Sequence, residues 1–370
     1  MSHSRKQPAE RYSFPDTSRL WHTEGQHTPS LGCARCIFNR DCGGLSVGAG
    51  VYDCTSLCRC ADPTNCTKVC PNNKLRLVQA MKEVRGLSLA TTARVQPLRS
   101  TELPRTVPLI YHPSKRMQSL DADTVALSLY RTLDKSTGVP RYRTPESLRA
   151  AFKLRADTRI VLSGTDTDPP LERVWGLPDR KAFFRTLADL RIDLVTTPNY
   201  SLICDNPRLD DLHNMKRIAI AHAEALGAGL PTALHVNGRT EFDYERWAKQ
   251  IEERDEIEWI AFEFGTGAGR STRMPFHLKQ LIALADFVSR PMRLIVRGGM
   301  SELPRLAPHF RQVTLIDTSA FIKAHKRQRA VLGAGKLDWE AAPTAQDEAL
   351  DDLLAHNIRV VAASVDALLQ

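Results

Sequence analysis

From about residue 106 onward, short apolar runs alternate with longer stretches in which apolar residues recur at helical spacing. Short, almost continuous apolar runs are typical of strands that are buried on both faces. The amphipathic stretches between them are typical of helices that cover such a sheet. Eight runs fit this description: Val107–Tyr111, Thr124–Tyr130, Arg159–Ser163, Leu194–Thr197, Ala233–Val236, Trp259–Phe264, Arg293–Val296 and Val313–Ile316.

Eight such strands predict an α/β protein, namely a (β/α)8 barrel of TIM type. The first two runs lie only about a dozen residues apart, which is too short for a complete strand–helix–strand crossover. We therefore expect the opening of the barrel to be degenerate.

Changes in composition divide the chain into four parts. Residues 1–30 are polar and are expected to form a flexible N-terminal segment. Residues 31–105 hold a Cys-rich metal-binding module, a helical stretch at Leu75–Val84 and a linker that wraps the barrel. The barrel is expected over 106–335, followed by a helical C-terminal extension over 336–370.

Cysteines are concentrated in the second part, where eight of the nine occur. The chain starts without the apolar core of a secretory signal, so a reducing compartment is expected, where clustered cysteines bind metal more often than they form disulfides. Eight thiolates would fill two closed zinc sites, which favours a structural role; an iron–sulfur cluster is the alternative. The candidate ligands are Cys33, Cys36, Cys42, Cys54, Cys58, Cys60, Cys66 and Cys70.

The formal net charge of +9 favours an anionic partner, with nucleic acid first. A hydrophobic fraction of 42% and a charged fraction of 25% exclude a largely disordered chain or a small disulfide scaffold. No apolar run reaches the roughly 18 residues of a membrane span. A cytoplasmic protein without membrane contact is expected.

Polar residues follow the predicted strands, at the barrel end where active sites are built. Acidic side chains stand out among them, because an apolar strand needs no acid at its tip. Each acid can instead cap the next helix, but together with neighbouring amides and an arginine they favour a site. The acids and amides are Asp166, Asn199, Asn237, Glu263 and Asp317, and the arginine is Arg297.

Four of these strand ends, in order over roughly residues 190–330, resemble motifs of the tRNA-guanine transglycosylase superfamily. In that family one strand ends in a Gly-rich turn, and the next carries a nucleophilic Asp that is followed by basic residues. The matching stretches are Ala233–Arg239, Ile260–Gly267, Arg297-Gly298-Gly299, and Asp317 followed by Lys326, Arg327 and Arg329.

The chain also departs from the family pattern. The family's Asp-Ser-Gly-Gly-Phe motif is absent, with Ser163-Gly-Thr-Asp166 as its nearest counterpart, and the cysteines precede the barrel instead of lying late in it. These differences place the chain nearer to the DNA-modifying members, which exchange guanine for a 7-deazaguanine such as preQ0. DNA is therefore favoured over tRNA as the substrate.

The resemblance implies a role for each matching residue. Asp317 would attack C1′ of the sugar and form a covalent intermediate, and Asp166 would act as the acid/base. Asn199, Asn237 and Glu263 would bind the base edge, and Tyr200 would stack on it. The flanking phosphates would contact Arg297, Lys326, Arg327 and Arg329, and the substrate-binding set is completed by His235, Gly265, Gly298 and Gly299.

Two other classes of protein stay open at the level of the sequence. The chain can be an iron–sulfur redox or radical enzyme that acts on a small molecule, or a barrel that binds nucleic acid without catalysis. The sequence does not define the oligomeric state.

The cysteine spacing generates a first prediction. The purified chain should be colourless and contain about two zinc ions per molecule, because eight thiolates satisfy two tetrahedral sites. Elemental analysis of the full chain tests this. A brown protein that contains iron in place of zinc would contradict the prediction and favour the redox alternative.

Overall fold

The computed structural model describes residues 82–98, 102–202, 208–269, 272–333, 336–345 and 348–370, with the side chains of Arg208 and Leu209 excepted. It also gives the backbone of two short paired strands, β1 (Thr28–Pro29) and β2 (Ser46–Val47). All eight clustered cysteines lie outside the described residues, as does Cys204. The predicted metal-binding module therefore stays a prediction.

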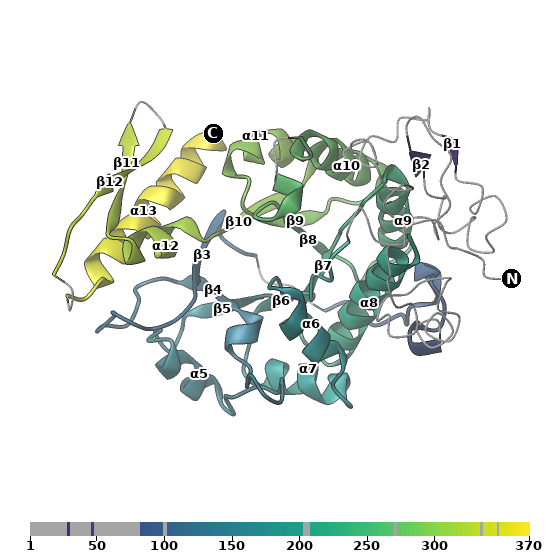
Figure 1. Cartoon of the computed structure of the whole chain (residues 1–370), viewed down its shortest axis with the longest axis horizontal. Coiled ribbons are helices and arrows are strands. Elements are labelled where there is room, and N and C mark those ends of the chain that lie inside the picture. Colours follow the sequence, from purple (N-terminus) through teal and green to yellow (C-terminus); the bar gives the residue numbers. More distant parts are fainter. Residues whose placement is uncertain are drawn as a thin grey trace, which may run out of the picture.

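Eight parallel strands close into a barrel, as the pattern of apolar runs predicted (Figure 1). The order around the barrel follows the chain, and the last strand pairs with the first. The strands are β3 (Thr106–Ile110), β4 (Thr124–Ser128), β5 (Arg159–Ser163), β6 (Leu194–Thr196), β7 (Thr232–His235), β8 (Trp259–Glu263), β9 (Arg293–Arg297) and β10 (Gln312–Asp317).

Both faces of these strands are buried, with alternate residues on opposite sides. Val161 and Ile295 belong to the cluster that fills the barrel interior, whereas Ile160 and Leu294 pack in the larger core beneath the helices. This double burial explains why the strand sequences are almost continuously apolar.

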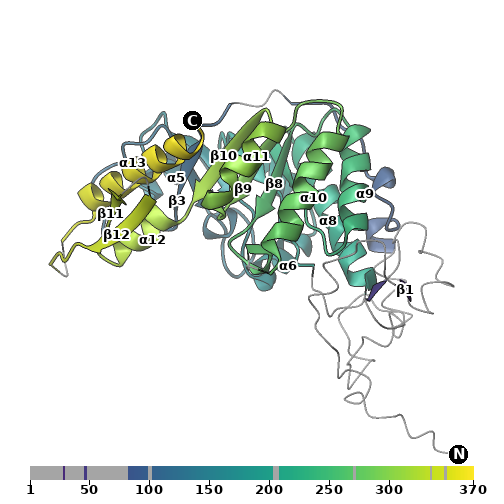
Figure 2. The ribbon, with the colours of Figure 1, turned by 90° about the horizontal axis from the view of Figure 1, so that it is seen from above.

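Helices surround the barrel, and Figure 2 shows α8, α9 and α10 side by side on its outer surface. Several begin with clear capping signals: Thr144 caps α5 and precedes Pro145, and Asp179 caps α7. The helices are α5 (Pro145–Ala151), α6 (Asp168–Trp175), α7 (Arg180–Asp189), α8 (Arg208–Gly227), α9 (Glu241–Glu252), α10 (Met274–Phe287), α11 (Leu303–Leu306) and α12 (Ser319–His325).

The expected degenerate opening is confirmed, since residues 111–123, all of them described, contain no helix between β3 and β4. Arg116 holds this connection in place. Its buried guanidinium donates hydrogen bonds to the carbonyl oxygens of Phe152 and Lys153, which follow α5. The backbone amides of Met117 and Gln118 donate to Asp351 of the C-terminal helix.

The C-terminal extension was expected to be helical, and this is wrong for its first part. Strands β11 (Gln328–Gly333) and β12 (Lys336–Ala341) form an antiparallel hairpin, followed by α13 (Asp351–Leu368). Asn357 on α13 is buried; its side-chain oxygen accepts from Ala330 N and its amide nitrogen donates to Gln328 O. This contact between segments distant in sequence fixes the strand, and local periodicity does not reveal it.

Residues 82–98 wrap the outside of the barrel, as expected, and two buried cations bind their backbone. Lys216 Nζ donates to Ser88 O at 2.6 Å and to the hydroxyls of Thr91 and Thr92. Arg254 donates to the carbonyl oxygens of Ala90, Thr92 and Ala93 and pairs with Glu256 at 3.2 Å.

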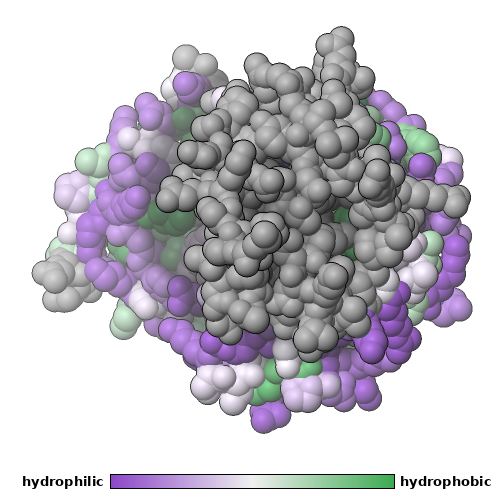
Figure 3. Space-filling model, turned by 45° about the vertical axis from the view of Figure 1, so that its right-hand side comes forward, coloured by the Kyte–Doolittle hydropathy of each residue, from purple (hydrophilic) through white to green (hydrophobic). Residues whose placement is uncertain are grey.

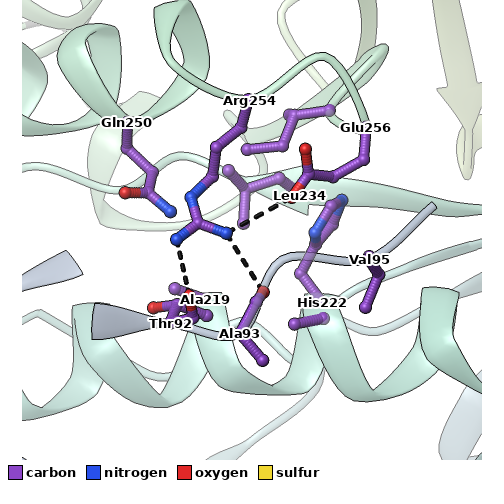
Figure 4. A pocket seen from close by; sticks show the side chains of 11 residues that line it. Thr92, Ala93, Val95, Ala219, His222, Leu234, Gln250, Arg254 and Glu256 are labelled. Atoms are coloured by element: carbon purple, nitrogen blue, oxygen red, sulfur yellow. Dashed lines mark hydrogen bonds and ion pairs between the residues drawn. The ribbon is translucent and has the colours of Figure 1, made fainter. Parts of the chain in front are cut away.

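Lys216 and Arg254 are together called the clamp below. A cavity of about 10 Å³ lies beside Arg254 and His222, and it has enough space for one water molecule (Figure 4).

The surface of the described residues is mainly polar where Figure 3 shows it. The large apolar side chains that are exposed belong to different segments: Met117, Val139, Phe287, Ile322 and Leu332. None of the helices among the described residues is both long enough and apolar enough to cross a membrane.

Replacing the clamp residue Arg254 with Met should lower the free energy of unfolding by about 3 kcal/mol, because three carbonyl oxygens and a buried carboxylate lose their donor. Urea denaturation of the full chain measures this. Arg305→Met is the matched control, since Arg305 is 57% exposed and its loss should cost less than about 0.5 kcal/mol. Equal effects of the two substitutions would show that the clamp is not stabilising.

Candidate active site

Four polar side chains form a connected cluster at the carboxyl-terminal end of the barrel, called here the mouth cluster: Thr165, His235, Glu263 and Arg297. Glu263 and Arg297 are register partners at the ends of β8 and β9, and they form an ion pair of 3.3 Å between Arg297 Nε and Glu263 Oε2. Arg297 Nη1 also donates to Thr165 O at 3.3 Å. Thr165 Oγ1 lies 3.5 Å from His235 Nε2.

Glu263 is the buried acid of the cluster, with 2% of its surface exposed. Burial raises the pKa of its carboxyl group, and the opposing effects of Arg297, the Gly265 amide and Thr165 do not cancel this. Its Oε1 accepts a hydrogen bond of 2.6 Å from Gly265 N. A buried carboxyl group whose pKa is raised holds a proton more readily than an exposed one, which makes Glu263 a candidate general acid/base.

His235 is neutral and its tautomer is defined by its contacts. Its Nδ1 lies 2.5 Å from Thr197 O, and a carbonyl oxygen can only accept, so Nδ1 carries the proton. Burial lowers the pKa of the ring to about 4, with a smaller opposing effect of the Thr197 contact. Nε2 is therefore a hydrogen-bond acceptor that faces the Thr165 hydroxyl.

Tyr111 lies directly after β3, at the same end of the barrel as the mouth cluster. Burial raises the pKa of its hydroxyl group, and the charges of Arg297, Glu263, Asp166 and Asp317 all act on it. The structure thus brings these residues to one end of the barrel, as predicted from the strand ends.

Asp317 occupies a different position from Glu263. The residues before it alternate so that Leu315 packs beneath the helices and Ile316 faces the barrel interior, which directs Asp317 toward the start of α12. Its carboxylate accepts from Ser319 N at 2.9 Å, Ser319 Oγ at 2.5 Å and Ala320 N at 2.9 Å. The helix-capping alternative therefore holds for Asp317, whether or not it also reacts.

Asp166 is exposed, and its carboxylate accepts from the amide of the adjacent Thr167. Asn199 and Asn237 lie at the ends of neighbouring strands, and Asn237 Nδ2 donates to Asn199 Oδ1. Both amides are half-buried. The pair orients an amide donor on Asn199 and a carbonyl acceptor on Asn237, as a site that reads a base edge requires.

The predicted glycines bring two loops together. Gly298 has φ of +76°, and a Cβ there would lie 2.9 Å from Gly265 N, so only glycine fits. A Cβ on Gly299 would meet the Phe264 ring at 2.8 Å. Gly265 N also donates to Arg297 O at 3.1 Å. These contacts position the loops around Glu263 without providing an anion cradle of their own.

Tyr200 does not lie where the role implied by the resemblance requires it. Tyr200 is buried, and its ring is covered by Arg217, whose guanidinium carbon lies 3.8 Å from the ring centroid, and by Trp175. It cannot stack on a base. The order of apolar residues gave no sign that α8 would cover this ring.

The basic residues that were predicted to bind the flanking phosphates do not lie together. Lys326 and Arg327 follow the far end of α12, about 10 Å along the helix from Asp317. Arg329 belongs to β11 and contacts His356 of α13 at 3.1 Å. Arg297, which was expected to bind a phosphate, is instead the ion-pair partner of Glu263.

Tyr111, Thr165 and Thr197 were not assigned to the site from the sequence. Tyr111 and Thr197 end predicted strands and Thr165 follows one by two residues, so the rule that located Asp166 could have found them; they were passed over because they carry no charge. Among the described residues, no group of three or more His, Cys, Asp or Glu side chains is arranged to hold a metal ion.

The fold and the site together define a (β/α)8-barrel protein with a polar, partly buried cluster at the end of the barrel where such folds carry out chemistry. No protein-family model matches the chain, and no curated protein matches it in sequence. Its activity must therefore be inferred from the site and its motifs.

Because the neutral form of His235 is required in the folded state, stability should fall as the pH drops from 6.5, its ordinary pKa, to about 4, its pKa in the fold. Above this window the contribution is fully present, and it amounts to roughly 3 kcal/mol. His235→Asn keeps a donor for Thr197 O but cannot titrate, so its unfolding midpoint in urea should depend less on pH. The surface variant His309→Asn should follow the wild type; an unchanged profile for His235→Asn would contradict this account.

Proposed function

We propose that this chain is a glycosyltransferase that exchanges guanine in nucleic acid, DNA in preference to tRNA, for a 7-deazaguanine base such as preQ0. One observation carries the proposal. Glu263, Arg297 and Asp317 lie at the ends of three successive strands, in the order of the transglycosylase-like motifs. The proposal includes the reducing, cytoplasmic setting and the zinc-binding module expected from the sequence.

The exchange requires two displacements at C1′ of the sugar. In the first, a carboxylate oxygen of Asp317 bonds to C1′ while the bond from C1′ to the guanine nitrogen breaks, and its electron pair leaves with the base. A proton must reach the departing base. In the second step the incoming base loses a proton, attacks C1′ and releases Asp317. The same acid/base can give the first proton and take the second.

Glu263 suits the acid/base role better than Asp166, which the sequence suggested. Glu263 is buried, has a raised pKa and pairs with Arg297, whereas Asp166 is exposed. Burial favours the protonated form of a carboxyl group, so Glu263 is better suited than Asp166 to give a proton to the departing base. Asp166 remains available to the incoming base at the rim.

Three groups can recognise the base. The Asn199–Asn237 pair offers a donor and an acceptor, and Nε2 of His235 is a further acceptor. A base in a polynucleotide reaches them only when it leaves the stack or is already single-stranded. The excess of 51 basic over 42 acidic residues supports attraction of the polymer to the chain.

A barrel that binds nucleic acid without catalysis is the second candidate, and one observation favours it. The Asp317 carboxylate already accepts three hydrogen bonds from the first turn of α12. As a cap alone, it would be structural.

Asp317→Asn separates the two candidates, since Asn caps a helix about as well as Asp but cannot serve as the nucleophile. Purified full-length protein is incubated with radiolabelled guanine and, separately, duplex DNA, single-stranded DNA and bulk tRNA. We expect label in DNA, and a loss of at least about a thousandfold in Asp317→Asn with nucleic-acid binding retained. Full activity in this variant would exclude Asp317 as the nucleophile.

Two further variants assign the acid/base in the same assay. Glu263→Gln should lose about 10²- to 10⁴-fold in rate, and Asp166→Asn should lose less. The opposite order would return the role to Asp166. Asp286→Asn, a change at an exposed side chain near the end of α10 and outside the motifs, is the matched control.

A further inference from the structure

A pair of histidines lies at the rim of the barrel, outside the mouth cluster. His112 follows β3 by two residues, and His325 ends α12; their ring centroids are 4.7 Å apart at an angle of 74°. Phe321 packs against both rings, at 4.9 and 4.4 Å. Because Phe321 also contacts Tyr111 at 5.6 Å, the pair adjoins the site described above.

Each ring has a buried nitrogen without a partner among the described residues: Nδ1 of His112 and Nε2 of His325. A buried polar atom without a hydrogen bond is costly, so such atoms often mark the place of a missing ligand or water. Both rings are half-buried, so these two nitrogens are covered while another part of each ring is open to solvent, where a ligand can bind.

The surroundings of the pair are positively charged. The charges of Lys115, Arg116 and Arg327 act on His325, and that of Arg131 acts on His112. Burial and these charges lower the pKa of His325 to about 4, and the pKa of His112 is lowered for the same two reasons.

Two acids near the pair have partners of their own. Asp351 on α13 lies 4.0 Å from Arg116 and accepts from the Met117 and Gln118 amides, while Asp317 at the other end of α12 binds its own helix start. Two neutral imidazoles surrounded by cationic side chains are poor ligands for a metal cation. An anion would offset the positive charge, so each ring could bind a proton and donate a hydrogen bond to the anion.

We propose that His112 and His325 form a phosphate subsite, with Arg131 and Arg327 supplying further positive charge at its edge. The assignment rests on the proposed function in one respect, in that the phosphate is taken to belong to the nucleotide next to the one that enters the mouth. The position beside Tyr111 and at the end of the helix that Asp317 begins fits a neighbouring nucleotide. Phosphate contacts of this kind fix the register of a polynucleotide without reading its sequence.

The first test uses inorganic phosphate and the full chain. Imidazole signals in NMR spectra are assigned with His112→Gln and His325→Gln, and each is titrated with pH in phosphate or in chloride of equal ionic strength. Phosphate should raise the pKa of both rings, and its binding should tighten as the pH falls. His309, which pairs with Asp286 at the surface, is the control. No response, the same response at His309, or binding of Zn²⁺ alone would overturn the proposal.

The second test uses a single-stranded DNA oligonucleotide. The double change His112→Gln and His325→Gln should weaken binding several-fold and reduce the slope of log affinity against log salt by about 1. Arg131→Gln, an exposed change that leaves the packed rings in place, should weaken binding in the same direction. His309→Gln should leave affinity and slope unchanged; variants that bind as the wild type does would overturn the proposal.

The two proposals fail separately. Phosphate binding at His112 and His325 without any base exchange would remove the proposed function and keep the subsite. Base exchange without a phosphate response at these rings would do the reverse.

Discussion

Closure of the eight-stranded parallel sheet is the constraint on which the rest of the molecule depends. A closed sheet has no free edge, and the packed interior and the outer helices exclude water from both faces of every strand. Strand positions such as Val161 and Ile295 must therefore be apolar. Charged side chains such as Glu263 and Arg297 occur where these strands end, so they gather at the mouth of the barrel. The position of the polar site therefore follows from the barrel architecture, whatever reaction the site performs.

Burial then determines the protonation of the mouth cluster. The same exclusion of water raises the pKa of the Glu263 carboxyl group and lowers that of the His235 imidazole, so both are driven toward their neutral forms. Arg297 pairs with Glu263 and limits the rise in the pKa of its carboxyl group. The Thr165 hydroxyl faces the His235 imidazole at 3.5 Å and also opposes that rise.

The sequence predicted the parts that depend on periodicity. All eight strands and the missing first helix could be read from it, because burial on both faces leaves an unbroken apolar run and a crossover needs a minimum length. The predicted Glu263, Arg297 and His235 do meet, because parallel strands end at the same rim. The hairpin at β11 and β12 was missed, since the buried Asn357, twenty-seven positions away from Ala330, fixes it. Tyr200 was misassigned for the same kind of reason: Arg217 covers it from a helix whose packing no local pattern reveals.

Helix α12 connects Asp317 with His325. At its start, Asp317 accepts hydrogen bonds that fix the direction of the carboxylate, which a nucleophile needs, but that also occupy lone pairs which a nucleophile must free. At its end, His325 and its neighbours gather positive charge. If a nucleotide's phosphate binds there, the rigid length of seven helical residues sets the distance from that phosphate to the sugar that Asp317 would attack. The helix would then act as a spacer, and a contact at the rim would contribute to the rate by placing C1′ correctly, without touching the reacting atoms.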